Sequence, residues 1–115
     1  MLRRRDEQIR KELPAFKGGK GAVQASVLLT SEELLGKGRV FNRMVLEQGS
    51  SIGPHTHEGD AEIFYILSGR GVAHDDGREV VLEPGDLLYT GDGHSHDLRN
   101  DEAEPLEFLA VILYT

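Results

Sequence analysis

The sequence predicts an all-β domain, built as a barrel or sandwich of antiparallel strands, and two observations support this prediction. The 115 residues include 14 glycines, many of them next to Asp, Pro or Ser, which is typical of tight turns between short strands. The apolar runs between these turns are short, and after the first 20 residues only one segment has the signals of a helix. A chain of this length therefore predicts one domain in which nearly all elements are strands.

The first 20 residues are predicted to form an N-terminal arm, and residues 21–115 to form the barrel domain. Charged side chains are frequent in the arm and apolar side chains are sparse. This composition predicts either a short helix that ends before Pro14 or a frayed arm. The glycine-rich residues 17–21 are expected to be a flexible connector to the first strand.

The first strand of the domain is predicted at residues 23–29, and a helical turn follows it. Thr30 and Glu33 have the spacing of a capping box at the start of this turn, in which each side chain bonds to the backbone N–H of the other residue. The next strand is predicted at residues 39–46. The sequence leaves open which face of this strand looks into the barrel, and therefore whether Arg43 points inward or outward.

Turns that contain glycine divide the rest of the chain into further strands. Asp76 and Gly77 suit a type I′ turn, which predicts a hairpin around them. His74 lies beside this turn and is expected to be a surface histidine. Residues 108–114 have no polar alternation, so both faces of the final strand are expected to be covered. The strands predicted after residue 70 are 71–74, 79–82, 86–89, one that begins near residue 96, and 106–115.

The stretch from residue 49 to residue 69 carries the side chains with the clearest chemistry. His55 and His57 are two positions apart, so on a strand both imidazoles point to the same face. Glu62 begins the next apolar run after a few turn residues, and it brings a carboxylate to a neighbouring position. The downstream stretch of residues 85–100 offers further imidazoles, those of His94 and His96. Three imidazoles and one carboxylate suit a borderline divalent ion such as Mn, Fe, Co, Ni or Zn.

Glycines at fixed distances accompany these residues. The first stretch follows the pattern G-x5-H-x-H-x4-E-x6-G from Gly49 to Gly69. The second follows G-x5-P-x-G-x2-H-x3-N from Gly85 to Asn100, with Gly91 in place of the usual proline. These patterns resemble the two motifs of the cupin superfamily. The resemblance implies a double-stranded β-helix, or jelly-roll barrel, of two antiparallel sheets and one bound metal ion, for which we expect manganese before Fe, Zn, Ni or Co. The metal ligands that it implies are His55, His57, Glu62 and His96.

The resemblance extends to single-barrel proteins of the oxalate-decarboxylase-like kind, and two classes of function stay open. The first is an enzyme that transforms a small carboxylate or other oxygen-rich molecule, as a dioxygenase, decarboxylase, isomerase or lyase. The second is a non-catalytic module that binds or senses such a ligand on the metal. A side chain able to move protons beside the metal would favour an enzyme, and His94 and Arg43 are the candidates. Each has a surface alternative, His94 in a turn at the barrel mouth and Arg43 in an ion pair.

Composition argues against several other functions. The chain has 20 acidic and 13 basic residues and a net charge of −7, so it is not expected to bind nucleic acid. It contains no cysteine, which excludes disulfides and thiolate metal sites. No apolar run approaches the ~20 residues needed to cross a bilayer, and no apolar segment of a secretion signal follows the N-terminal arginines. We therefore expect a soluble, cytoplasmic protein that binds neither membranes nor nucleic acid.

Strand alternation also predicts an apolar surface. Glu62 is expected to point into the barrel. Its outward-pointing neighbours on the same strand are then Ile63, Tyr65 and Leu67. Together with one face of residues 109–113, they would leave a large apolar patch on a single chain. We therefore expect a homodimer in which two-fold pairing covers this patch, as the cupin resemblance also implies.

Overall fold

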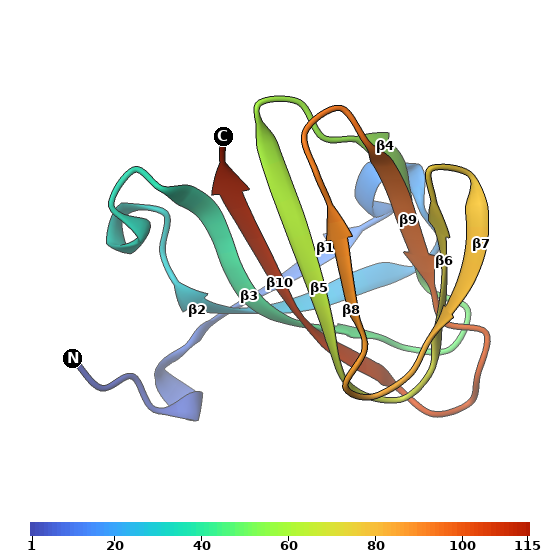
Figure 1. The fold of residues 1–115 in the computed structure, drawn as a ribbon. Helices are drawn as coiled ribbons and strands as arrows, with labels where there is room; N and C mark the ends of the chain where they lie inside the picture. Colours follow the sequence, from blue (N-terminus) through green and yellow to red (C-terminus); the bar gives the residue numbers. More distant parts are fainter.

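A computed structural model describes residues 1–115 and contains two antiparallel β-sheets that pack against each other (Figure 1). The larger sheet has six strands in the order β1-β2-β3-β10-β5-β8, and the smaller sheet has four in the order β4-β9-β6-β7. This arrangement confirms the predicted all-β jelly-roll barrel. No helix in it is long and apolar enough to cross a membrane. The elements are η1 (Arg5–Glu7), β1 (Ile9–Pro14), η2 (Phe16–Gly18), β2 (Ala22–Leu29), η3 (Glu32–Leu34), β3 (Gly38–Leu46), β4 (Ser51–Thr56), β5 (Asp60–Ser68), β6 (Gly71–Asp75), β7 (Arg78–Leu82), β8 (Leu87–Thr90), β9 (Ser95–Arg99) and β10 (Leu106–Tyr114), where η denotes a single 3-10 turn.

The C-terminal strand β10 lies in the middle of the larger sheet, between β3 and β5, although it is far from β3 in the sequence (Figure 1). On its inner face Phe108 and Ala110 are completely buried, whereas Leu109 and Val111 on the outer face stay partly exposed. The expectation that both faces of this strand are covered therefore holds for the inner face only. The reason is that the smaller sheet covers only the inner side of the larger one.

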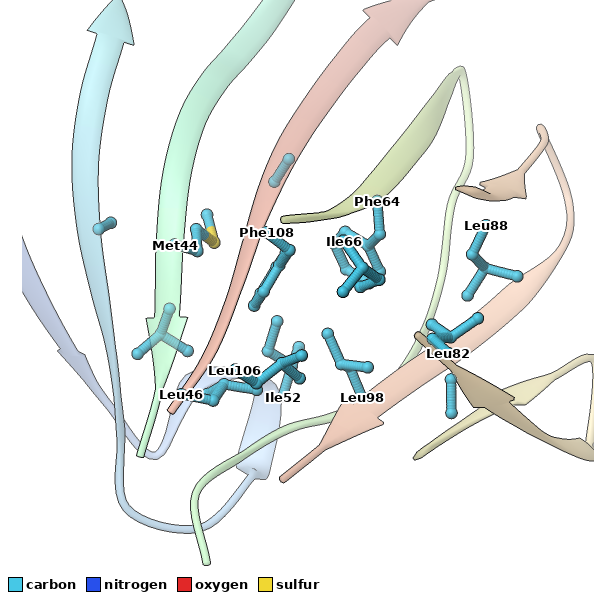
Figure 2. Packing of buried hydrophobic residues seen from close by; sticks show 14 residues of the cluster. Met44, Leu46, Ile52, Phe64, Ile66, Leu82, Leu88, Leu98, Leu106 and Phe108 are labelled. Atoms are coloured by element: carbon cyan, nitrogen blue, oxygen red, sulfur yellow. The ribbon is translucent and has the colours of Figure 1, made fainter. Parts of the chain in front are cut away.

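The core lies between the two sheets and follows the predicted alternation of β5. Phe64 and Ile66 are each 1% exposed, whereas Tyr65 and Leu67 on the other face are 39% and 38% exposed. The rings of Phe64 and Phe108 meet edge to face with 5.1 Å between their centroids, a geometry that adds ~0.5–1.5 kcal/mol to the effect of burial alone. The larger side chains that fill the core are Met44, Leu46, Ile52, Phe64, Ile66, Leu82, Leu88, Leu98, Leu106 and Phe108 (Figure 2).

The structure confirms two turns that the sequence predicted. Asp76 and Gly77, between β6 and β7, have φ of 50° and 84°, as a type I′ turn requires of both central residues. Thr30 and Glu33 form the expected capping box before η3. The backbone N–H of Glu33 donates to Thr30 Oγ1 at 3.3 Å, and the backbone N–H of Thr30 donates to Glu33 Oε1 at 2.9 Å.

The first 20 residues contain a strand where the sequence predicted a helix or a frayed arm. β1 pairs with β2 along its whole length and forms one edge of the larger sheet. Nearly all side chains of β1 are exposed. The strand therefore needs no apolar face, and its sequence lacks the alternation that marks a half-buried strand. Arg3 fixes the segment before β1, because its guanidinium donates two hydrogen bonds of 2.8 and 2.9 Å to the Glu33 carboxylate.

Candidate metal centre

Three imidazoles and one carboxylate meet on the inner side of the barrel. His55 lies on β4, His57 follows that strand directly, Glu62 lies on β5 and His96 on β9. One possible ligand atom of each lies within 4.8 Å of the others. His57, Glu62 and His96 are buried, and His55 is partly buried. The structure therefore brings together the four residues that the sequence predicted as metal ligands.

The pairing of the strands explains why these residues meet. His55 and His96 are register partners on the antiparallel strands β4 and β9, so their side chains are neighbours on one face of the smaller sheet. Glu62 lies opposite Thr90 of β8 in the larger sheet. Gly59 turns the chain between β4 and β5 with φ of 77°, a conformation that glycine adopts without steric cost. The turn brings Glu62 from one sheet against the histidines of the other.

His55 and His57 are held through their Nδ1 atoms, which leaves the Nε2 atoms free. Nδ1 of His55 donates to the backbone carbonyl of Gly53 at 2.8 Å. Nδ1 of His57 donates to Oδ1 of Asp60 at 2.7 Å. Because a carbonyl and a carboxylate can only accept, the proton must lie on Nδ1 in both rings. Hydrogen bonds of this kind orient the histidines of metal sites and fix their tautomers.

His96 is positioned by two residues of the larger sheet. Its Nδ1 is hydrogen-bonded to the hydroxyl of Thr90 at 2.7 Å. Its ring stacks on Phe64, with 4.7 Å between the centroids and 6° between the planes. Thr90 and Phe64 are both 1% exposed, so the imidazole has little freedom to turn. Its Nε2 therefore points to the same place as the Nε2 atoms of the other two histidines.

The distances between the four ligand atoms suit one metal ion. Nε2 of His96 lies 3.2 Å from Nε2 of His57 and 3.1 Å from Nε2 of His55. Oε1 of Glu62 lies 3.0 Å from Nε2 of both His57 and His96. Neighbouring ligands of an octahedral ion bound at ~2.1 Å are separated by ~3.0 Å. With one proton each, on Nδ1, the neutral rings of His55 and His57 turn their Nε2 lone pairs toward the other ligand atoms, an arrangement that a cation between them stabilises.

Hydrogen bonds determine the charges around the centre. Burial opposes the ionisation of Glu62, but in the absence of metal the interactions with His55, His57 and His96 keep the pKa of this carboxyl below its usual range. The hydrogen bond with Glu62 raises the pKa of His57; burial opposes this effect and the bond with Asp60 adds to it. Burial also opposes the ionisation of Asp60, but its bonds with His57 and Arg39 lower the pKa of this carboxyl. In the absence of metal, a proton on His57 is therefore favoured, and this proton competes with the metal.

A cavity of about 140 Å³ leads to the centre. Two cationic side chains, Lys17 and Arg39, line it together with three of the four candidate ligands. The Nε of Arg39 donates to Oδ2 of Asp60 at 3.1 Å, so Arg39 is connected to His57 through that carboxylate. The apolar lining residues are Phe16, Val40, Met44, Ile52 and Ile112.

The two candidates for proton transfer do not line this cavity. Arg43 points to the outer face of the larger sheet, where its Nη1 donates to Glu107 at 2.9 Å, while its neighbour Met44 points inward. The sequence left the direction of Arg43 open, and the structure shows that it points outward and forms a surface ion pair with Glu107. His94 lies in the turn before β9 with its side chain 59% exposed, and its Nδ1 is bonded to Asp76. Of the two alternatives for His94, the structure shows the one in which it is a turn residue at the barrel mouth.

Sequence reasoning did not find Asp60, Lys17 or Arg39. Asp60 has a local signal, because a carboxylate three residues after His57 can bond back to its Nδ1, as it does at 2.7 Å. Lys17 and Arg39 have no such signal, since the tertiary fold brings them to the cavity. The η2 segment reaches it through a backbone contact between Lys17 and Gly53, where a side chain on Gly53 would have no room.

Comparison with known proteins places the chain in a described family. Residues 42–112 match the family model described as "Cupin domain". A protein of Thermotoga maritima named oxalate-binding protein is 45% identical over 113 residues, which cover 98% of this chain and 93% of that protein. Quercetin 2,3-dioxygenase of Bacillus subtilis is 39% identical over 54 residues, which cover 47% of this chain and 16% of that one.

Solved structures agree with this result. A crystal structure of a protein from Thermotoga maritima, described as a predicted oxalate decarboxylase, has a TM-score of 0.95 and 44% identity, and each chain covers 100% of the other. The structure of KdgF from a Halomonas species has a TM-score of 0.78 and 16% identity, and covers 100% of this chain and 94% of its own. At this lower identity the likeness shows a common fold.

Proposed function

The chain belongs to the cupin family, and we propose that it binds a small carboxylate through one divalent metal ion. The ligands of the ion are His55, His57, Glu62 and His96. The observation that carries this proposal is the convergence of three Nε2 atoms and one carboxylate oxygen, all buried or partly buried, within 4.8 Å. The similarity to a protein named oxalate-binding protein supports the class of ligand.

We propose manganese as the metal. Imidazole nitrogens combined with a carboxylate oxygen suit manganese among other borderline divalent ions. The protein supplies four ligands, so an ion that takes six would keep two positions for a chelating molecule. With neutral imidazoles and an ionised Glu62, the site with its ion has a net charge of about +1. Once bound, the ion supplies a Lewis-acidic centre that attracts carboxylate oxygens. Elemental analysis of protein purified without added metal tests this choice, and an excess of zinc or iron over manganese would contradict it.

The cavity supports a small, oxygen-rich ligand. Its volume of about 140 Å³ is well below the ~300–1,000 Å³ of pockets for drug-sized molecules. Its apolar wall, which includes Val40 and Met44, excludes water and strengthens the attraction between the ion and an anion. A compact anion with two oxygen donors, such as oxalate, satisfies both conditions.

We propose binding in preference to chemical transformation. A general acid or base must come within hydrogen-bond reach of the substrate, and neither His94 nor Arg43 lines the cavity. Apart from the candidate ligands, the charged side chains that line it are Lys17 and Arg39. Both are cations suited to holding an anion in place. A binding or sensing module accounts for these side chains without a further catalytic group.

Titration calorimetry with metal-loaded and metal-free protein tests the proposal. We expect oxalate to bind the manganese-loaded protein in a one-to-one ratio and the metal-free protein at least about tenfold more weakly, since the ion provides the charge that holds the anion. Simple 2-keto acids and sugar phosphates serve as comparison ligands. Equal binding to both forms would contradict metal-dependent binding. Product analysis after incubation with oxalate separates the two classes of function, because consumption of the ligand would identify an enzyme.

We further propose that the protein forms a two-fold homodimer through the outer face of the larger sheet. Strand pairing places Tyr65 beside Leu87 and Ile63 beside Tyr89, and Leu87 and Tyr89 are 58% and 61% exposed. An apolar surface that spans several strands is typical of a protein interface. The same register continues this surface to β10, where Leu109 lies opposite Tyr65.

Sedimentation analysis tests the dimer. The chain has a mass of 12.7 kDa, and we expect a species of twice this mass at micromolar concentration. Leu87→Glu should produce the monomer, because a buried unpaired charge opposes association. Val81→Glu is the matched control, since Val81 is also exposed, at 44%, but lies on β7 of the smaller sheet. A wild-type protein that sediments as a monomer would rule out this interface.

We also propose that the protein acts in the cytoplasm. It contains no cysteine, so its stability does not depend on the disulfides that are common in oxidising compartments. Cell fractionation tests this location, and recovery from the medium or the periplasm would contradict it.

A further inference from the structure

The η2 segment is held in an unusual backbone conformation beside the cavity. Ala15 and Lys17 have φ of 49° and 55°, in the left-handed region that residues with a side chain seldom adopt. Two other non-glycine residues have positive φ, and each has a local role: Leu35 ends η3 and Asp76 forms the hairpin turn. Ala15 and Lys17 lie in the η2 turn, where the backbone N–H of Gly18 donates to the carbonyl of Ala15 and that of Gly19 to the carbonyl of Phe16, each at 2.9 Å. Backbone strain that the surrounding structure maintains is frequent at functional sites.

Close contacts with β4 maintain this conformation. The carbonyl of Lys17 lies against Gly53, where a Cβ atom would have no room. The carbonyl of Gly53 also accepts the hydrogen bond from Nδ1 of His55. One residue of β4 therefore positions both a candidate metal ligand and the backbone of Lys17. Ser51 adds two hydrogen bonds with Lys20, each of 2.9 Å.

Lys17 is an exposed residue whose positive charge has no carboxylate partner. It lines the cavity, its Nζ lies 5.6 Å from the centre of the Phe16 ring, and it forms no ion pair with a carboxylate of the chain. Arg39 is different, because its Nε donates to Asp60 at 3.1 Å. With a divalent ion in place, the ion and the two cations carry four positive charges, against two negative charges on Glu62 and Asp60. A net charge of about two positive units then faces the ligand.

We propose that Lys17 selects ligands with two negative charges, so that the preferred ligand is a short dicarboxylate of the oxalate type. The proposal rests on the proposed function, since it concerns the same metal-bound ligand. The ion attracts any small chelating carboxylate, whether it carries one charge or two. Only a ligand with a second negative charge also gains from the ammonium group of Lys17, through a charge-assisted hydrogen bond or a close ion pair.

Calorimetry with two ligands and three variants tests this selection. Oxalate carries two negative charges, and glycolate is a chelator of similar size that carries one. In the manganese-loaded Lys17→Met protein, we expect the affinity for oxalate to fall about tenfold, as for the loss of a charge-assisted hydrogen bond. The affinity for glycolate should change less than about twofold. Lys17→Arg should recover most of the affinity for oxalate, because it restores the charge.

Lys20→Met is the matched control, because Lys20 belongs to the same connector but does not line the cavity. It should bind both ligands as the wild type does. Methionine is no more strained than lysine at positive φ, so Lys17→Met should keep the fold, and elemental analysis should find the manganese content of the variant unchanged. Equal affinity of Lys17→Met and wild type for oxalate would overturn the role of Lys17, as would an equal loss for both ligands. A wild-type protein that binds neither ligand would instead overturn the proposed function.

Discussion

The histidines of the candidate metal centre and the two surface histidines, His74 and His94, share one feature and differ in another. In all five, Nδ1 has a hydrogen-bond partner within the chain. His74 is bonded to Asp97 and His94 to Asp76, and the two imidazoles are 40% and 59% exposed. In the centre, by contrast, the Nε2 atoms point to one place and meet the carboxylate of Glu62.

This comparison shows that an oriented histidine is not by itself a metal ligand. A partner at Nδ1 sets the tautomer and the direction of any imidazole. A metal site also needs several Nε2 atoms aimed at one point. The pairing of β4 with β9 provides this, because it places His55 opposite His96. The hairpin of β6 and β7 places His74 opposite Glu79 at the surface, where no second imidazole faces it.

The largest expected effect is the loss of the metal in His57→Ala. This change removes one of the four ligands, and the remaining three, His55, Glu62 and His96, do not make a complete site. Elemental analysis should find about one ion per chain in the wild type and almost none in the variant. His94→Ala should keep the metal content of the wild type, because His94 is a surface histidine. Full occupancy in His57→Ala would show that the four residues are not the ligand set.

The next effect concerns the partner of a ligand rather than the ligand itself. Asp60→Asn should weaken metal binding by roughly 10–100-fold, because Asp60 accepts the hydrogen bond that orients His57. Asp97→Asn is the matched control, since Asp97 has the same relation to His74 at the surface and should leave the metal affinity unchanged. Competition with a chelator measures both affinities. A similar loss in the two variants would mean that the Asp60 effect is not specific to the centre.

A smaller effect is expected from pH. In the metal-free protein, Glu62 and Asp60 raise the pKa of His57 above its ordinary value of ~6.5. The resulting stabilisation is fully present below pH ~6.5 and is lost as the pH rises through the raised pKa. Metal binding requires His57 without its second proton, so it strengthens over the same range. The increase in melting temperature caused by manganese should therefore be larger at pH 8 than at pH 6, and an increase that shrinks with pH would contradict the competition.

The smallest effect is expected at the surface. The hydrogen bond with Asp76 raises the pKa of His94, so the pair stabilises the fold below the ordinary histidine pKa and loses this effect as the pH rises through the raised value. Metal-free His94→Ala should therefore melt slightly below the wild type at pH 5.5 and at nearly the same temperature at pH 9. Differential scanning calorimetry measures both. A difference that does not depend on pH would show that the ion pair is not its cause.

The fold was predictable because strand alternation and turn residues are patterns of short range, and the resemblance to the two cupin motifs named the four candidate ligands that the structure brings together. The two-residue spacing of His55 and His57 places them on one side of a strand, and the alternation after Glu62 gives the inner and outer faces of β5. The direction of Arg43 was not predictable, because both faces of residues 39–46 mix apolar and polar side chains. Only the pairing of β3 with β2 and β10 decides it.

The residues that sequence analysis missed depend on contacts between distant segments. Lys17 lies in a stretch that predicts a flexible connector, yet the contact with Gly53 fixes it beside the cavity. β1 was missed for a related reason. Its polar side chains carry no period-two apolar signal, and hydrogen bonds to β2 alone make it a strand. Local propensity cannot report a conformation that another part of the chain imposes.

The chemistry of β1 has a consequence for how copies of the chain behave toward one another. This edge strand carries Arg10, Lys11 and Glu12 and ends at Pro14, which has no N–H to donate. Charged side chains and proline at the border of a sheet oppose the addition of a strand from another molecule. The sequence of β2 behind it, AVQASVLL, contains no charge. A chain shortened by its first 14 residues would expose this uncharged strand and aggregate through it, although all four candidate metal ligands would still be present.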